Sequence, residues 1–184
     1  MNIGFDLDRI FINYPPFVPA RAIDYFHQDH SKKRLFYRIP KTPLSKFFRR
    51  LIHCSPMRPK IAKNIRFIQN FPYHNPHKPN LYLISSRYKT LEDITRRKLK
   101  EYNLVEPFDA IYLNIKNQQP HIFKAGMLKK LKINLFVDDN LLVLKYLKKH
   151  CPKTQLLWYN PYTKEKDEEI PTITGLEEIK HFLK

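Results

Sequence analysis

Short apolar runs recur along the chain and alternate with longer segments in which apolar residues follow helical spacing. Runs this short are typical of buried β-strands. Because successive positions in them are apolar, the strands should be covered on both faces. We predict strands at Ile3–Leu7, Leu81–Ile84, Ala110–Leu113, Ile133–Val137 and Gln155–Tyr159.

The intervening segments have the spacing of amphipathic helices. We predict helices at Arg58–Asn70, Thr90–Asn103, Ile122–Leu131, Leu141–Lys149 and Glu177–Leu183. Thr90 should cap its helix, with Asp93 returning the hydrogen bond, and Asn160–Glu169 should be an exposed loop. Strands that alternate with helices predict an α/β fold, a Rossmann-like three-layer sandwich with a parallel sheet between two layers of helices.

One stretch departs from this regular pattern. The chain has 34 Lys and Arg against 17 Asp and Glu, a net charge of +17, and residues 21–79 carry fourteen of the cations and only two of the acids. Ten of the fifteen prolines lie between Pro15 and Pro79. We therefore expect a small, basic, mostly helical cap at residues 15–55, inserted after the first strand into a core domain of residues 1–14 and 56–184.

The clearest element of the expected cap is a helix at Pro43–His53. Its apolar stripe consists of Leu44, Phe47, Phe48, Leu51 and Ile52, and its other face carries Lys46, Arg49 and Arg50. Such a stripe usually packs against a neighbouring element. A basic amphipathic helix can also meet an anionic membrane or an acidic partner, and the sequence leaves both interpretations open.

Composition excludes several classes of protein. Three glycines are too few for a Gly-rich phosphate loop, and no apolar run reaches the length of a membrane span. The first eleven residues contain Asp6 and Asp8 where a signal peptide would be apolar, so we expect a cytoplasmic protein, with secretion into a host cell as an open alternative. Cys54 and Cys151 provide no disulfide framework.

Polar side chains follow three of the predicted strands. The first strand ends in Asp6-Leu7-Asp8, the second in Ser85-Ser86-Arg87, and the fourth in Asp138-Asp139-Asn140. The carboxyl ends of parallel strands share one edge, so four carboxylates should gather there and repel one another unless a cation lies among them. Hard oxygen ligands without His or Cys indicate Mg²⁺.

These residues resemble the motifs of the haloacid dehalogenase-like (HAD) superfamily, which consists mostly of Mg²⁺-dependent phosphatases. Asp6 and Asp8 match its Asp-x-Asp motif, Ser85 its second motif, Lys124 its lysine, and Asp138 with Asp139 its acidic pair. Taken alone, each motif has a simpler interpretation as a turn former, a cap or a solvated lysine. The resemblance rests on the presence of all four motifs in the same order along the chain.

The resemblance implies a role for each residue. Asp6 is the nucleophile that forms an aspartyl-phosphate, and Asp8 is the general acid and base. Ser85 binds a phosphate oxygen, and Lys124 offsets the negative charge. Mg²⁺ is held by Asp6, by the backbone carbonyl of Asp8, and by Asp138 and Asp139. The sequence does not decide which of this last pair touches the metal directly.

Arg9 replaces the glycine that usually follows the Asp-x-Asp motif. Arg9 either brings its guanidinium into the site or points outward and pairs with an acid, and the replacement also allows a site that turns over slowly. Ser86, Arg9 and Arg87 are the candidate substrate-binding residues.

The function we expect is a Mg²⁺-dependent phosphomonoester hydrolase acting on a nucleotide or a phosphoprotein. The alternative is a non-catalytic or weakly active basic module that binds an anionic macromolecule or a membrane surface. The partners expected are a phosphorylated substrate and, through the basic cap, an anionic macromolecule. The sequence does not indicate the oligomeric state.

Overall fold

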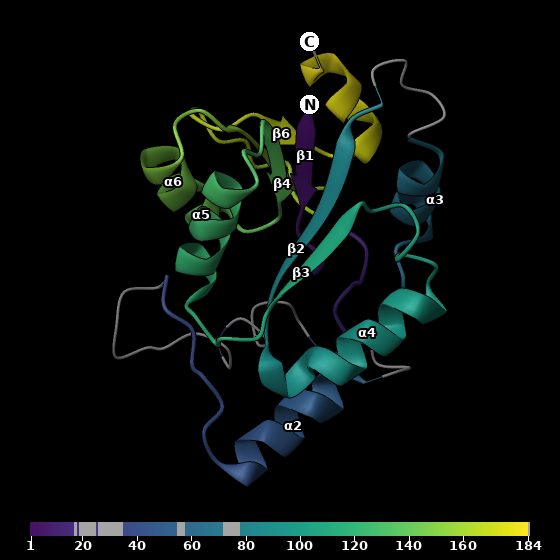
Figure 1. Cartoon of the computed structure of the whole chain (residues 1–184), viewed down its shortest axis with the longest axis vertical. Helices are drawn as coiled ribbons and strands as arrows, with labels where there is room; N and C mark the ends of the chain where they lie inside the picture. The colour runs from purple at the N-terminus through teal and green to yellow at the C-terminus, as the bar shows by residue number, and fades with distance from the viewer. Residues whose placement is uncertain (17, 19–24, 26–34, 55–57, 72–77, 184) are drawn as a thin grey trace.

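The computed structural model describes residues 1–16, 18, 25, 35–54, 58–71 and 78–183 (Figure 1). Its centre is a sheet of six parallel strands in the order β3-β2-β1-β4-β5-β6. The strands are β1 (Asn2–Phe5), β2 (Asn80–Tyr88), β3 (Ala110–Asn114), β4 (Leu135–Asp138), β5 (Gln155–Tyr159) and β6 (Thr172–Ile173).

The strand order reverses next to β1. The chain runs from β1 outward to β2 and β3 and then returns to place β4 on the other side of β1. At such a switch point, the connections leave the carboxyl ends of the two central strands in opposite directions, which opens a crevice for a ligand. The acidic residues that follow β1 and β4 flank this crevice.

Helices cover both faces of the sheet (Figure 1). They are α2 (Pro43–His53), α3 (Ala62–Asn70), α4 (Glu92–Glu101), α5 (Pro120–Lys130) and α6 (Leu141–His150), together with the 3₁₀ helices η2 (Lys89–Leu91) and η3 (Leu176–Phe182). Leu135 and Val137 of β4 pack in the layer of α3, α4 and η3, whereas Phe136 packs in the layer of α5 and α6. This alternation confirms the predicted three-layer sandwich.

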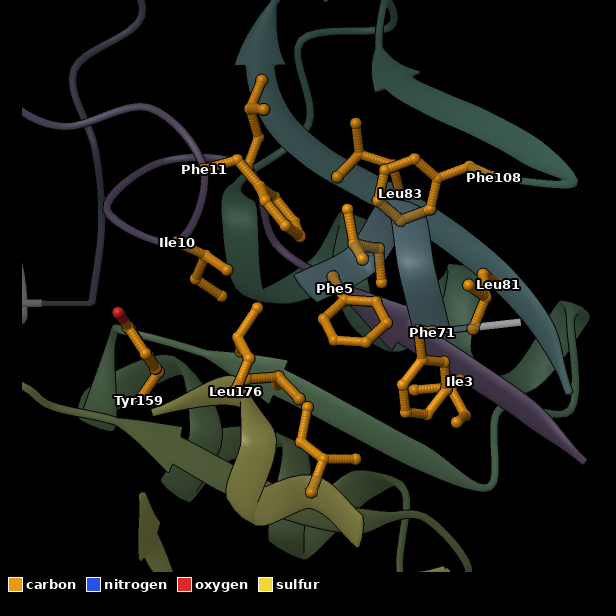
Figure 2. Packing of buried hydrophobic residues seen from close by; sticks show 14 of the residues in the cluster. Ile3, Phe5, Ile10, Phe11, Phe71, Leu81, Leu83, Phe108, Tyr159 and Leu176 are labelled. Carbon is orange, nitrogen blue, oxygen red and sulfur yellow. The ribbon is translucent and has the colours of Figure 1, made fainter. Parts of the chain in front are cut away.

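An aromatic cluster lies beneath the chain that leaves β1. Phe5, Phe11 and Phe108 pack edge to face, with ring centroids 5.7 to 6.2 Å apart (Figure 2). All three side chains are buried. The segment from Asp6 to Ile12 is therefore anchored on the core at both of its ends, which fixes the acidic residues between them.

The predicted strands are all present, but some details differ. The two-residue strand β6 was missed because a strand this short has no recognisable pattern. The predicted capping box is wrong: Thr90 lies inside η2, α4 begins at Glu92, and the carboxylate of Asp93 pairs with Arg50 instead. The last predicted helix is a 3₁₀ helix.

The helix predicted at Pro43–His53 is present with those bounds as α2. The Oγ1 of Thr42 caps it by accepting a hydrogen bond from the backbone N–H of Ser45 (3.2 Å). The expectation that its apolar stripe packs on a neighbour is wrong for most of the stripe. The exposed fractions of Leu44, Phe47, Phe48 and Leu51 are 65%, 60%, 54% and 49%.

The polar side of α2 faces the body of the molecule instead. Arg50 forms a bidentate pair with Asp93 of α4 (2.9 and 2.6 Å) and donates to the carbonyl of Thr90 (2.7 Å), while His53 is buried. The division into a core and a cap of residues 15–55 stays a prediction, and much of that range lies outside the described residues. None of the described helices is both long and apolar enough to cross a membrane.

Candidate active site

Three carboxylates converge at the switch point between β1 and β4. Asp6 follows β1, Asp138 ends β4 and Asp139 comes next in the chain. One carboxylate oxygen from each lies within 4.8 Å of the others. Asp6 and Asp138 are buried, and Asp139 is only slightly exposed. The sequence prediction that β1 and β4 bring these side chains to one edge therefore agrees with the structure.

Lys124 reaches this cluster from α5. Its Nζ lies 3.0 Å from Oδ1 of Asp6 and 2.6 Å from Oδ2 of Asp138. Burial alone would lower the pKa of Lys124, but the two carboxylates raise it above its usual value. The two carboxylates therefore favour the positively charged form of Lys124. Of the lysines of α5, which are Lys124, Lys129 and Lys130, it is the one that contacts the acidic cluster.

One lysine does not balance three crowded acids. The pKa of Asp6 is raised to about 7, chiefly by burial and also by Asp138 and Asp8, against the opposing effect of Lys124. Burial likewise raises the pKa of Asp139 well above its usual value. The cluster thus favours a further positive charge, either a proton or a metal ion. Its donors are carboxylate oxygens alone, a set that suits Mg²⁺.

Arg9 occupies the position where the family motif has glycine, and its backbone φ is +58°. This left-handed conformation is the one that glycine adopts without strain. The guanidinium turns toward the site: Nη1 lies 3.2 Å from Oδ2 of Asp139, and Cζ lies 4.6 Å from the ring centre of Tyr162. Arg9 therefore both pairs with an acid and lines the site.

Asp8 lies apart from the acidic cluster and is held by two arginines. Arg87 binds it in a bidentate manner, Nε to Oδ2 at 2.9 Å and Nη2 to Oδ1 at 2.7 Å, and Nη2 of Arg58 also donates to Oδ1. Burial would raise the pKa of Asp8, but Arg87 and Arg58 hold it well below its usual range. In this conformation Asp8 is a carboxylate. The expected role of its backbone carbonyl as a metal ligand stays a prediction.

The two serines at the end of β2 have different surroundings. Ser85 is fully buried, and its Oγ accepts a hydrogen bond from the backbone N–H of Arg87 (3.4 Å). Ser86 lines the cavity beside the acids, and its Oγ has no hydrogen-bond partner among the described residues. Of the two, Ser86 is therefore the one placed to meet a ligand.

A cavity of about 310 Å³ opens over these groups. Its charged lining residues are Asp6, Asp8, Asp139, Arg9, Arg49, Arg58, Arg87 and Lys124. Besides Ser86 Oγ, it contains buried atoms without a hydrogen-bond partner in the described chain, namely Nε and Nη1 of Arg58 and the hydroxyl of Tyr88. Leaving such an atom unpaired costs about 1–3 kcal/mol, which favours a ligand that accepts hydrogen bonds.

Structural comparison shows which known fold this arrangement belongs to. YfnB of Bacillus subtilis, described as a HAD-hydrolase and crystallised with magnesium, matches with a TM-score of 0.65 at 14% identity, over 99% of this chain and 97% of its own. The chain has the HAD-like fold. The resemblance inferred from the motifs is therefore confirmed at the level of the fold.

Other solved structures with the HAD-like fold agree. SP0104 of Streptococcus pneumoniae, a haloacid dehalogenase-like hydrolase, matches with a TM-score of 0.55 at 13% identity, over 99% of this chain and 98% of its own. A β-phosphoglucomutase from Pyrococcus sp. strain ST 04 matches with a TM-score of 0.57 at 14% identity, over 96% of this chain and 93% of its own. No family model and no curated protein matches the sequence.

Within this HAD-like fold, the structure adds residues that the sequence did not indicate. Arg58 and Arg49 line the cavity, with the rings of Tyr14, Tyr37 and Tyr88. Arg58 was expected to begin the helix at Arg58–Asn70, but α3 begins only at Ala62, and the helical spacing did not mark Arg58 as a site residue. Arg49 was noted only as part of a basic helix face, and the tyrosines were not noted at all.

Proposed function

We propose that the protein is a Mg²⁺-dependent phosphomonoester hydrolase that acts through an aspartyl-phosphate on Asp6. The observation that carries this proposal is the cluster of Asp6, Asp138 and Asp139 with Lys124 at the base of a cavity. The HAD-like fold and a structural neighbour crystallised with magnesium support it.

In the proposed reaction, a carboxylate oxygen of Asp6 forms a bond to phosphorus while the bond from phosphorus to the ester oxygen breaks. The ester oxygen takes up a proton and leaves as an alcohol. A water molecule then attacks the phosphorus and loses a proton, which releases inorganic phosphate and restores the Asp6 carboxylate. Lys124 stabilises the charge that gathers at Asp6.

Asp6, Asp138 and Asp139 are the residues that would hold Mg²⁺. When bound, the metal orients the phosphoryl group and reduces the repulsion between two anions. Ser86, which lines the cavity with an unpartnered Oγ, binds a non-bridging oxygen of the phosphoryl group.

Proton delivery by Asp8 requires that it be released from Arg58 or Arg87, since both stabilise its ionised form. Aryl phosphates are therefore the first substrates to test, because a phenolate leaves with less help from an acid than an alkoxide does. The same pairing favours the second candidate, a weakly active HAD-like protein that mainly binds an anionic ligand.

The test is hydrolysis of 4-nitrophenyl phosphate with Mg²⁺, with a chelator, and in the Asp6→Asn variant. We expect turnover that chelation and Asp6→Asn abolish, and an acid-quenched phosphoprotein whose label lies on the peptide containing Asp6. Glu106→Gln, which removes an exposed carboxylate far from the cavity, is the matched control. Undiminished activity in Asp6→Asn would contradict the proposal, and ligand binding without turnover would favour the weakly active candidate.

A further inference from the structure

On the side of Asp8, the cavity contains more positive charge than that one carboxylate balances. Arg9 pairs with Asp139, but Arg58 and Arg87 share the single carboxylate of Asp8. Arg49 has no acidic partner among the described residues, and its guanidinium lies 5.5 Å from the ring centre of Tyr88. Arg58 and Arg87 with their one shared carboxylate, together with Arg49, therefore leave two positive charges on this side of the cavity.

The same side of the cavity contains hydrogen-bond donors that have no acceptor within the described chain. Nε and Nη1 of Arg58 and the hydroxyl of Tyr88 are buried, and within the described part of the chain they have no hydrogen-bond partner. Burial raises the pKa of Tyr88 to about 12, so its hydroxyl keeps its proton at neutral pH. Unpaired donors combined with excess positive charge are what an anionic group would satisfy.

We propose that Arg49, Arg58 and Tyr88 form a subsite for a second anionic group of the substrate, a carboxylate or a second phosphate. This inference rests on the proposed function and names the class of substrate: a phosphomonoester with another anionic group. The transferred phosphoryl group has separate partners in Lys124 and Ser86 beside Asp6. A cavity of about 310 Å³ is at the small end of ligand sites, which favours a small molecule.

The test compares two esters of nearly the same size that differ in charge, 4-(carbamoylmethyl)phenyl phosphate and 4-(carboxymethyl)phenyl phosphate. The methylene group separates the carboxylate from the ring, so that the two phenols leave with similar ease. We expect the wild-type protein to prefer the acidic ester in kcat/KM by at least about tenfold, the usual effect of one hydrogen bond between charged groups.

Variants identify the residues responsible for this preference. Arg49→Gln should lower it about tenfold, and Tyr88→Phe, which removes only a hydroxyl, should lower it several-fold. Arg97→Gln makes the same chemical change at an exposed position of α4 and should leave the preference unchanged. Binding of the two matching phosphonates, measured by calorimetry, gives the same comparison without turnover.

The outcomes separate this inference from the proposed function. Equal kcat/KM for both esters in an active protein would overturn the subsite and leave the hydrolase intact. A preference that survives Arg49→Gln and Tyr88→Phe would also overturn it. If neither ester is hydrolysed but the acidic phosphonate binds more tightly, and does so through Arg49, the subsite is supported and the hydrolase is contradicted.

A second inference comes independently from the outer face of α2. Leu44, Phe47, Phe48 and Leu51 form a continuous apolar stripe of exposed side chains, and the rings of Phe47 and Phe48 lie 5.9 Å apart. The helix lies at the end of the molecule opposite the C-terminus (Figure 1). The stripe therefore faces outward, while the polar side of α2 contacts the rest of the molecule through Arg49 and Arg50.

The charges beside this stripe indicate what it meets. Arg38, Lys41 and Lys46 are exposed around it, and residues 35–54 include no acid. A second copy of the chain would place like charges opposite one another, whereas an anionic lipid surface would attract them. We propose that α2 docks the protein on an anionic membrane, with its apolar stripe in the acyl boundary.

The test is co-sedimentation of the full chain with vesicles of phosphatidylcholine, either alone or mixed with phosphatidylglycerol. We expect binding to the mixed vesicles that weakens with added salt. The double change Phe47→Ser and Phe48→Ser should lower it at least about tenfold, because two phenyl groups no longer leave water. Ile122→Ser, which removes an exposed apolar side chain from α5, should leave binding to the mixed vesicles unchanged.

Absence of binding to the mixed vesicles would overturn the proposal. Sedimentation equilibrium provides the second measurement. A dimer that dissociates on the double change, in a protein that does not bind vesicles, would show that the stripe joins two copies instead.

Discussion

Replacing Asp6 by Asn should make the metal-free protein more stable while it abolishes turnover. Asn has nearly the same shape, and its amide oxygen can still accept a hydrogen bond from Lys124, which lies 3.0 Å from Oδ1 of Asp6. The change removes one of three carboxylates whose oxygens lie within 4.8 Å of one another. It therefore removes like-charge repulsion and the cost of burying an ion.

The expected gain follows from the pKa of Asp6. Its value rises from 3.8 to about 7 in the folded protein, about three pH units, and each unit corresponds to about 1.4 kcal/mol. The folded wild-type protein binds this proton more tightly than the unfolded chain does. The stabilisation of the folded state that results is present below about pH 4 and is lost as the pH rises through 7. At pH 8 the gain from Asn should reach at most about 4 kcal/mol, and near pH 4 it should vanish.

The assay is urea denaturation of both proteins with a chelator, at several pH values between about 4 and 8. Added Mg²⁺ should stabilise the wild-type protein and the variant to different extents, because Asn provides a weaker ligand than a carboxylate does. Glu106→Gln, an exposed acid far from the cavity, should show neither the pH-dependent gain nor the difference in Mg²⁺ response.

An Asp6→Asn variant less stable than the wild type at pH 8 without metal would contradict this prediction. Lys124 would then more than compensate for the burial of the acids. A gain of similar size at pH 4 and pH 8 would also count against it, since the effect would not come from ionisation.

Three further predictions concern neighbouring groups. Mg²⁺ affinity, measured by calorimetry, should rise with pH up to about 7 and release a proton, because Asp6 must ionise to bind the metal; an affinity independent of pH would contradict its role as a ligand. Lys124→Met should lower the free energy of unfolding by about 3–5 kcal/mol at pH 8 in chelator, since it leaves Asp6 and Asp138 without their buried cation. Urea denaturation measures this loss of stability, and added Mg²⁺ should restore part of it. Arg9→Gly should be more stable than Arg9→Ala by about 1 kcal/mol, because only glycine adopts a φ of +58° without strain; equal denaturation midpoints would contradict this.

The sheet and the acids at its edge were predictable because both depend on local patterns. An apolar run identifies a strand, and parallel strands of a doubly wound sheet place their carboxyl ends together. The strand-end positions of Asp6 and Asp138 therefore implied their proximity without any knowledge of loops. Lys124 was less certain from sequence, since several lysines are close in the chain and only the packing of α5 shows which of them faces inward.

The arginines around Asp8 were not predictable in the same way. Arg58 is far from Asp8 in the sequence and lies outside the regular elements, so its contact depends on how the chain returns to the sheet. Ser85 and Ser86 show a related difficulty. The register of β2 with β3 is irregular between Ser85 and Tyr88, so strict alternation along the strand could not be used to choose between the two serines.

Helix α2 shows why amphipathicity predicts a helix more securely than its orientation. The spacing of Leu44, Phe47, Phe48 and Leu51 correctly predicted a helix, and the hydrophobic effect alone would have turned these residues inward. In the structure the opposite face lies inward, where Arg49 lines the cavity and Arg50 pairs with Asp93. An exposed pair such as Arg50–Asp93 contributes less than about 1 kcal/mol, so it cannot by itself compensate for four exposed apolar side chains. The exposure of these four apolar side chains is the physical basis for the proposed membrane contact.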